Sequence, residues 1–413
     1  MGTLHSIDGG MAQPMGDGVT PPEVRNMQTL DCWVKLWVRN SFENFATLRT
    51  SKEREHAHSL FELKDIGRGR PAIILGAGAS LDDALEGEEG ELLRNVGNRA
   101  VVLAPNSTTK TCLRHGVEPY AFLAMHPTGE VAHAFNLSDL DHPVPMRCKG
   151  RRLITSTAIH PDVLNGWLYD GDAGDVYLSL QWHSQTLNIV TGKDDDKGEL
   201  EVSRLQSADI PSDWYGNVQA AAWNEGMPDQ PLHPWQARGF KLPVVPNAGC
   251  VVNYGIEVAA IMGCSPILLL GVDFAFSPSD AQPLRYKCKR WRVRPPTRWQ
   301  RVKQGLGLWD AELDGEWYDS TNYAQAAQTI FGHRLREAKA FTAPTRYSHE
   351  YMVGYRNSLY QLYGKGLDLD NLPLDIINCS LDGIVTDVPR MPLAEALQTI
   401  RKGAWQRREA VAA

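Results

Sequence analysis

Short apolar runs that alternate with longer helical stretches are the feature that most constrains the fold of this 413-residue chain. A strand that is buried on both faces is apolar throughout, and parallel strands need crossover connections that are usually helices. The sequence therefore predicts an α/β protein, with a Rossmann-like parallel sheet covered by helices on both faces. The strand-like runs are Ala72–Leu75, Ala100–Ala104, Ala121–Ala124, Leu153–Thr155, Val176–Leu180, Ile267–Leu270 and Ile376–Asn378.

The remaining segments suggest how the chain is organised around this sheet. Residues 1–27 are rich in Gly, Pro and Met and are expected to form a disordered tail. Trp33, Trp37 and Phe45 belong to a pattern of helical spacing, which predicts an N-terminal helical extension over residues 28–69. The other expected parts are a catalytic domain (70–276 and 346–400) with a lid-like insertion (192–243), a basic and aromatic insertion (277–345) and a C-terminal tail (401–413).

Composition limits the classes of function. Hydrophobic residues make up 43% of the chain, enough for a full core, and the net charge of −7 means that any polyanion site must be local. Seven scattered cysteines without metal-ligand spacing indicate reduced thiols and no metal site. No apolar run approaches the roughly 18 residues of a membrane span. We therefore expect a cytoplasmic protein without membrane association, and the sequence leaves its oligomeric state open.

A glycine-rich turn follows the first run. Residues Gly76, Ala77, Gly78 and Ser80 lie between that strand-like run and a helix-like segment that begins near Leu81. Such a turn presents free backbone N–H groups to a phosphate, and glycine permits close approach. The Ser80 hydroxyl could cap the helix or bind the same phosphate. The third glycine of the dinucleotide fingerprint is missing, so a tight structural turn is the alternative.

Polar residues follow three other runs, at the sheet edge where open α/β proteins bind ligands. Asn106 and Ser107 could bind a ribose or base; the alternative is a helix cap by Ser107 or Thr108. His126 could act as a general base or bind a leaving phosphate, unless it is a loop histidine bonded to a backbone carbonyl. Asp273 could hold a sugar hydroxyl, a metal or a catalytic proton, or could cap a neighbouring loop.

Several motifs resemble the MptE-like family over residues 35 to 400, apart from the insertions. They are the glycine turn, Asn-Ala-Gly-Cys-Val at 247–251, Gly-Val-Asp-Phe at 271–274, Ile-Asn-Cys-Ser-Leu-Asp-Gly at 377–383 and the segment 389–395. The family includes flagellin glycosyltransferases called motility accessory factors and archaeal 6-hydroxymethylpterin diphosphokinases. It is similar in fold to bacterial sialyltransferases that use CMP-sugars.

This resemblance implies a nucleotide held by the glycine turn, with Asn106, Gly249 and Asp273 around the same crevice. Asn247 and Asn378, from the same motifs, are further donor-binding candidates. The chain departs from the family at three places. Ala79 stands where relatives usually have proline, Asp382-Gly383 where they have a glycine pair, and His126 where they often have an acidic residue.

The histidine at position 126 affects the expected mechanism. Diphosphoryl transfer needs Mg²⁺ bound through carboxylates and phosphates, and only Asp273 is an obvious carboxylate in the crevice. We therefore favour glycosyl transfer from a nucleotide-sugar without a metal, with His126 as base and His183 and His349 in reserve. The alternatives are a Mg²⁺-dependent pterin-type diphosphokinase and a non-catalytic nucleotide-binding protein.

The segment 285–303 contains nine Lys or Arg residues and no acid, together with three aromatic residues. Cations neutralise phosphates and aromatic rings stack on bases, so this composition favours DNA as the acceptor. The acceptor hydroxyl would belong to a hydroxymethylated base that is flipped out of the duplex, as in viral DNA modification. A contact to the donor or a glycan, or a solvated basic face, are the alternatives. The candidate acceptor-binding residues are Lys289, Arg290, Trp291, Arg292, Arg294 and Trp299.

Overall fold

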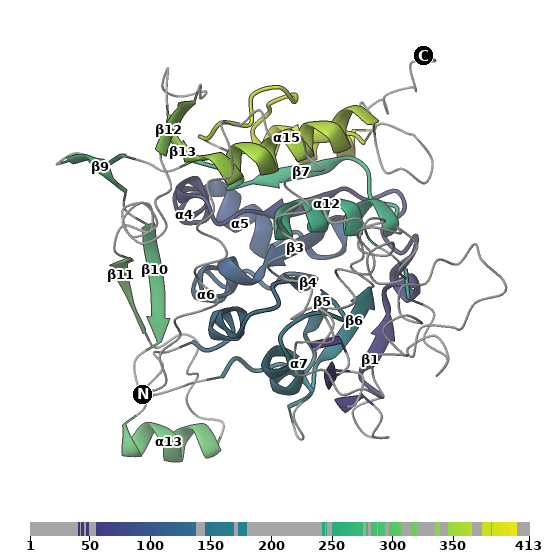
Figure 1. Cartoon of the computed structure of the whole chain (residues 1–413), viewed down its shortest axis with the longest axis vertical. Helices are drawn as coiled ribbons and strands as arrows, with labels where there is room; N and C mark the ends of the chain where they lie inside the picture. The colour runs from purple at the N-terminus through teal and green to yellow at the C-terminus, as the bar shows by residue number, and fades with distance from the viewer. Residues whose placement is uncertain are drawn as a thin grey trace, which may run out of the picture.

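The computed structural model describes residues 55–137, 145–168, 172–179, 250–275, 346–365 and 374–402 (apart from Leu381), and pieces within 40–48, 242–245, 278–306, 315–320 and 335–338. Its centre is one eight-stranded parallel sheet in the order β1-β6-β5-β4-β3-β2-β7-β14 (Figure 1). The strands are β1 (Ala57–Ser59), β2 (Ala72–Leu75), β3 (Val101–Pro105), β4 (Ala121–Ala124), β5 (Arg152–Ser156), β6 (Asp175–Ser179), β7 (Ile267–Leu270) and β14 (Ile376–Asn378).

The chain builds this sheet outward from β2 in two directions. Strands β3 to β6 follow one another on one side of β2, and β7 and then β14 lie on the other side. The register pairs Ala72 with Val101 on one side and with Ile267 on the other. The strand order therefore reverses between β2 and β7, and open sheets of this kind bind ligands at such a reversal.

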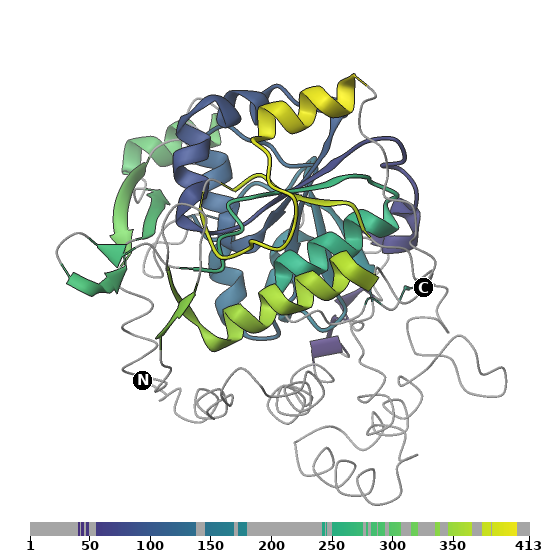
Figure 2. The same cartoon turned by 90° about the horizontal axis from the view of Figure 1, so that it is seen from above.

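Helices cover both faces of the sheet, because the side chains of the buried strands alternate between two cores. Ile73 and Leu75 contribute to one core, and Ala72 and Ile74 to the other. Figure 2 shows α12 (teal) and α15 (yellow-green) on one face and α16 (yellow) on the opposite face. The helices around the sheet are α4 (Ala79–Glu86), α5 (Glu88–Arg94), α6 (Thr109–Arg114), α7 (Pro161–Trp167), α12 (Val251–Ile261), α15 (Glu350–Lys365) and α16 (Leu393–Arg401).

Short 3₁₀ helices occupy several connections, and the basic insertion forms small elements of its own. The 3₁₀ helices are η1 (Leu60–Leu63), η2 (Gly97–Arg99), η3 (Asn106–Thr108) and η4 (Gly129–Ala134). The described residues here form three antiparallel pairs, β8 with β9, β10 with β11 and β12 with β13, and the helix α13; β13 lies just after the predicted end of the insertion. Their bounds are β8 (Pro278–Ser279), β9 (Gln282–Tyr286), β10 (Cys288–Val293), α13 (Arg298–Gly305), β11 (Gly315–Ser320), β12 (Leu335–Ala338) and β13 (Arg346–His349).

The structure confirms the predicted fold class, and each of the seven predicted runs contains a strand of the sheet. It differs in the N-terminal extension, because residues 57–59 form the edge strand β1, parallel to β6, instead of helix. Residues 57–59 contain only one apolar side chain and therefore show no hydrophobic pattern typical of a strand. Their conformation is determined by pairing with β6. Residues Asn40, Ser41, Glu43, Asn44 and Thr47 are helical; we call them the docking helix.

Other predicted parts fall outside the described residues. They are the tail 1–27, nearly all of the lid-like insertion (residues 192–241) and residues 403–413. Among the helices that the structure describes, none has the length and apolarity needed to cross a membrane.

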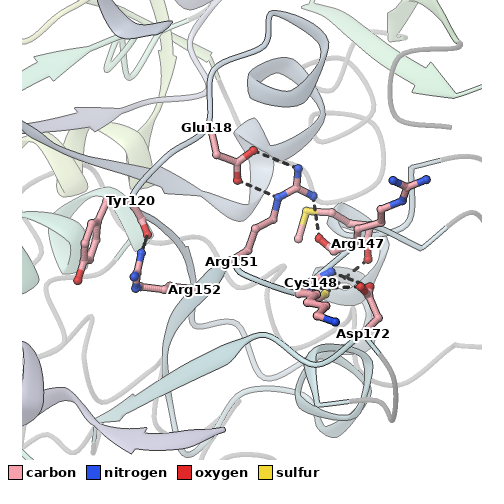
Figure 3. Close-up of polar contacts among 9 residues, drawn as sticks. Glu118, Tyr120, Arg147, Cys148, Arg151, Arg152 and Asp172 are labelled. Atoms are coloured by element: carbon pink, nitrogen blue, oxygen red, sulfur yellow. Dashed lines mark hydrogen bonds and ion pairs between the residues drawn. The ribbon is translucent and has the colours of Figure 1, made fainter. Parts of the chain in front are cut away.

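Polar contacts connect the segments at the amino edge of the sheet, before β4, β5 and β6 (Figure 3). The Arg151 guanidinium donates to both carboxylate oxygens of Glu118, at 2.8 and 3.1 Å. Arg152 lies 4.5 Å from the ring centroid of Tyr120, and an Asp172 oxygen accepts the backbone N–H of Cys148 at 2.8 Å. These contacts connect the segments that precede β4, β5 and β6.

Candidate functional site

The carboxyl edge of the sheet holds most of the predicted site residues that the structure describes. Because β2, β3 and β4 are adjacent and parallel, the segments after them lie side by side. These segments contain residues 76–80, 106–107 and His126, which we call the carboxyl-edge cluster. Asp273 follows β7, on the other side of β2.

Asp273 binds the glycine turn directly. The backbone N–H of Ser80 donates to one carboxylate oxygen at 2.9 Å, and the Ser80 hydroxyl makes a short hydrogen bond to the other. Both residues are only 4% exposed. The carboxylate lies at the N-terminus of α4, where the helix dipole favours a negative charge. Asp273 therefore occupies the type of position that a phosphate was expected to take.

The glycines of the turn serve the contact between the ends of β2 and β7. The N–H groups of Gly76 and Gly78 donate to the carbonyls of Leu270 and Gly271, at 2.7 and 2.8 Å. A Cβ on Gly76 would lie 2.3 Å from the Gly271 oxygen, and one on Gly78 would lie 2.3 Å from a carboxylate oxygen of Asp273. No side chain fits at either position.

The expectation of free amides at Gly76, Gly78 and Ser80 is therefore wrong for this structure, because all three donate to the chain itself. Ser80 also does not cap its helix, since its hydroxyl bonds Asp273. The tight structural turn, the alternative from the sequence, is what the geometry shows. Ala77 is the exposed residue of the turn.

The C-terminal motif and the residue after it contact the backbone of Asp273. The Ile384 N–H donates to the Asp273 carbonyl at 2.9 Å. Gly383 has φ +110°, and a Cβ at this position would lie only 2.5 Å from the Asp273 Cα. Asn378 is fully buried: its Nδ2 donates to the Val385 carbonyl and its Oδ1 accepts the Ser380 N–H, both at 2.9 Å. The prediction that Asn378 contacts a donor is therefore wrong in this conformation, because both ends of its amide are used internally.

Asn106 and Ser107 lie at the surface of the cluster, half-buried and exposed respectively. The alternative assignment as helix caps is not observed at Thr108, whose hydroxyl donates to the Pro105 carbonyl at 2.8 Å and does not cap α6. The next hydroxyl, of Thr109, donates to the Asn106 carbonyl at 2.8 Å. These bonds fix the backbone of η3 and leave Asn106 and Ser107 at the edge of the sheet.

His126 is exposed at the end of β4, and Thr128 orients its ring. Its Nδ1 lies 2.8 Å from the Thr128 hydroxyl and accepts the Thr128 N–H at 3.4 Å. An accepting Nδ1 places the proton of the neutral ring on Nε2. Although the ring reaches solvent, the surrounding protein desolvates it and lowers its pKa below the ordinary value. The imidazole is therefore neutral at pH 7, with its lone pair on Nδ1.

The docking helix holds the loop that contains His126, a feature that the sequence analysis missed. Asn40 donates through Nδ2 to the carbonyls of Pro127 and Ala158, at 2.7 and 3.2 Å. One turn later, Asn44 donates to the carbonyls of Thr157 and Ile159, at 2.9 and 2.7 Å. Both asparagines are fully buried. Two asparagines spaced i, i+4 on an aromatic-rich helix were the available signal.

The basic strand β10 lies beside α4 and α6, the helices that follow the ends of β2 and β3 (Figure 1). Lys289, Arg290, Trp291 and Arg292 belong to this strand. In the hairpin register, Lys289 pairs with Asp319 and Arg292 with Glu316.

The other candidates are placed apart or not at all. Trp299 lies on α13 and is 74% exposed, and His349 ends β13. Asn247, Gly249, His183 and Arg294 lie outside the described residues.

Five cysteines that the structure describes are free thiols. Cys112, Cys148, Cys264 and Cys379 are buried, and Cys250 is partly buried. Burial raises the pKa values of Cys112, Cys250, Cys264 and Cys379 to about 12. Within the described ranges, no group of three or more His, Cys, Asp or Glu side chains is arranged to hold a metal ion.

Comparisons with known proteins find similarity to solved structures but to no family model. No protein-family model matches the chain, and no curated protein matches it either. A solved structure of the MAf glycosyltransferase from Magnetospirillum magneticum AMB-1 is similar, with a TM-score of 0.41 and 15% sequence identity. The match covers 85% of this chain and 42% of that protein, so this chain spans less than half of its length.

Proposed function

We propose that the chain is a glycosyltransferase that moves a sugar from a nucleotide-sugar donor to a hydroxyl group. The observation behind this proposal is His126, an exposed imidazole with a lowered pKa at the carboxyl edge of the sheet. A base of this kind is neutral at pH 7 and can take the proton of an acceptor hydroxyl. The motif resemblance described above suggests the class of donor.

The donor is proposed to lie over the outer side of the carboxyl-edge cluster. Ala77, Asn106 and Ser107 are the residues that reach its surface after β2 and β3, and the last two can hydrogen-bond a ribose or base. Asp273 is then a positioning residue, which holds the turn by binding Ser80. This replaces its proposed catalytic role, since its carboxylate is nearly fully buried in that contact.

The reaction uses His126 as the base. Nδ1 takes the proton of the acceptor hydroxyl, in the place where the Thr128 hydroxyl lies in this structure. The acceptor oxygen then attacks the anomeric carbon, and the bond from that carbon to the donor phosphate breaks. The nucleotide leaves with the bonding electrons, and nearby cations of the insertion would offset its charge.

The hydrogen bonds between the Asp273 carboxylate and Ser80 also help to distinguish the alternative functions. A diphosphokinase needs carboxylates directed at Mg²⁺, whereas Asp273 is directed at Ser80. This favours glycosyl transfer without a metal. A non-catalytic nucleotide-binding protein is the third alternative, and it predicts ligand binding without turnover.

For the acceptor, we propose DNA with a hydroxymethylated base. Support comes from the position of β10, whose sequence is rich in Lys and Arg, beside the helices of the proposed donor site. The base would have to leave the duplex to reach His126. Salt-dependent binding to duplex DNA, lost when Arg290 and Arg292 are replaced by Gln, would support this acceptor. Turnover on a glycan or a protein without DNA binding would reject it.

The donor class is tested by thermal stabilisation of the protein with UDP-, GDP- and CMP-sugars and with ATP, each with and without Mg²⁺. A ligand that prefers the folded state raises Tm. We expect one nucleotide-sugar to raise Tm without Mg²⁺, and Asn106→Ala with Ser107→Ala to reduce that shift. Stabilisation by ATP and Mg²⁺ alone would contradict the proposal and favour the diphosphokinase.

A further inference from the structure

Helix α13 of the basic insertion exposes an apolar stripe. Trp299, Val302 and Leu306 are 74%, 47% and 65% exposed. Their spacing of i, i+3 and i+7 places them on one face of the helix and its last turn. Large apolar side chains exposed together on one face mark a binding surface more often than singly scattered ones do.

Cations flank this stripe on both sides. At about 100° per residue, the three apolar positions span roughly 60° of the helix, with Arg298 on one flank and Lys303 on the other. Arg301 lies next to Arg298 on the wheel, and all three cations are exposed. The segment 285–303 contains no acid that could compensate them locally.

The helix is stabilised by its own capping box, so its exposed face is not needed to form it. The Thr297 N–H donates to the Gln300 side chain at 2.8 Å, and the Gln300 N–H donates to the Thr297 hydroxyl at 3.3 Å. Among the described side chains of the helix, Gln300 is half-buried, and Arg298, Trp299, Arg301, Val302 and Lys303 are exposed. The capping box therefore fixes the start of the helix without using the apolar stripe.

We propose that α13 binds an anionic membrane surface, with its apolar stripe among the lipid chains and its cations at the headgroups. Interfacial helices have this arrangement of an aromatic and aliphatic face between basic residues. Nucleic acid fits less well, because Val302 and Leu306 would find no apolar partner on a phosphate backbone. Peripheral binding of this kind needs no membrane-spanning helix. The proposal does not depend on the proposed glycosyl transfer. It revises the expectation from the sequence that the protein does not associate with membranes.

The test measures co-sedimentation of the full chain with vesicles of phosphatidylcholine, alone or mixed with phosphatidylglycerol. We expect binding to the mixed vesicles that weakens with salt, and about a tenfold loss of affinity for Trp299→Ser with Leu306→Ser. Arg298→Gln with Lys303→Gln should weaken binding to mixed vesicles and leave binding to phosphatidylcholine unchanged. Phe61→Ser removes an apolar side chain that is 39% exposed elsewhere and is the matched control.

Three results would overturn the proposal. The first is equal vesicle binding by the wild type and the Trp299→Ser, Leu306→Ser variant, or no vesicle binding at all. The second is binding to duplex DNA, without vesicle binding, that this variant loses. The third is a wild-type dimer in sedimentation velocity that becomes a monomer in the variant, since the stripe would then bind a second copy. Because the substituted side chains are exposed, equal Tm values are expected and verify that all variants fold.

Discussion

Ser80 and Asp273 meet across 193 residues of sequence, and their contact is buried. Replacing Ser80 by Ala removes a hydroxyl donor from a buried carboxylate, which costs about 1–3 kcal/mol of unfolding free energy. We expect this loss in urea denaturation of Ser80→Ala. Ser107→Ala, at an exposed position of the same edge, is the control and should change stability by less than about 0.5 kcal/mol.

A double-mutant cycle with Asp273→Asn shows whether the lost unfolding free energy comes from the interaction between Ser80 and Asp273. Residues in direct contact have interaction energies of about 0.5–3 kcal/mol, whereas independent sites add. Strict additivity of Ser80→Ala and Asp273→Asn would mean that the hydrogen bond from the Ser80 hydroxyl to the Asp273 carboxylate contributes nothing to stability.

His126 is the residue that the proposed chemistry depends on most. Because a positioned general base contributes at least about 10²-fold, His126→Ala should lower kcat by that factor or more in a transfer assay. His133→Ala replaces an exposed histidine on the neighbouring η4 and should leave kcat unchanged. A loss of only a few-fold in His126→Ala would remove His126 from the role of base.

The pH dependence gives a second readout of the same residue. Desolvation lowers the pKa of His126, so the neutral ring persists below pH 6.5 and protonates only as the pH falls further. The acidic limb of the kcat profile should therefore lie below pH 6.5. An acidic limb above that value would indicate a different base.

The docking helix is the element that connects the N-terminal extension to the site. Asn44→Ala removes two hydrogen bonds and leaves the carbonyls of Thr157 and Ile159 without their donor. We expect an unfolding free energy lower by about 1–3 kcal/mol. Thr47→Ala removes a 3.4 Å contact to Asn165 at the surface of the same helix and should have little effect.

Asn40→Ala should act on the site as well as on stability, because Asn40 also holds the carbonyl of Pro127, next to His126. If it positions the base, kcat falls more in Asn40→Ala than in Asn44→Ala at equal stability. Equal kcat values in the two variants would assign the docking helix a structural role alone.

At the scale of elements, the sequence correctly predicted the strands that are determined by their own hydrophobic pattern. Strands such as β2 and β7 were predicted to the residue, because strands that are buried on both faces are apolar throughout. The edge strand β1 was missed, since only its partner β6 makes residues 57–59 a strand. The glycine turn was located correctly but explained incorrectly: sequence shows that Gly78 has no Cβ, but not that Asp273 fills the space.

In the molecule as a whole, the buried aromatic cluster contributes far more to stability than the ion pair at the amino edge. The ring of Trp167, 1% exposed, lies 5.5 and 6.1 Å from those of Phe135 and Phe122. Trp167→Ala should cost about 3–5 kcal/mol in thermal or urea unfolding. Arg151→Ala breaks the partly exposed pair with Glu118 and should cost less than about 1 kcal/mol. Similar losses would mean that the aromatic core is packed more loosely than the structure shows.

The strand order also has a consequence for biosynthesis. Until residues 267–270 leave the ribosome, the central strand β2 has β3 on one side and an open row of amides and carbonyls on the other. Nascent chains fold from the N-terminus, and unprotected strand edges invite aggregation. The edge of β2 therefore stays unpaired while the long segment before β7 is synthesised, and we expect chaperones to protect it during this time.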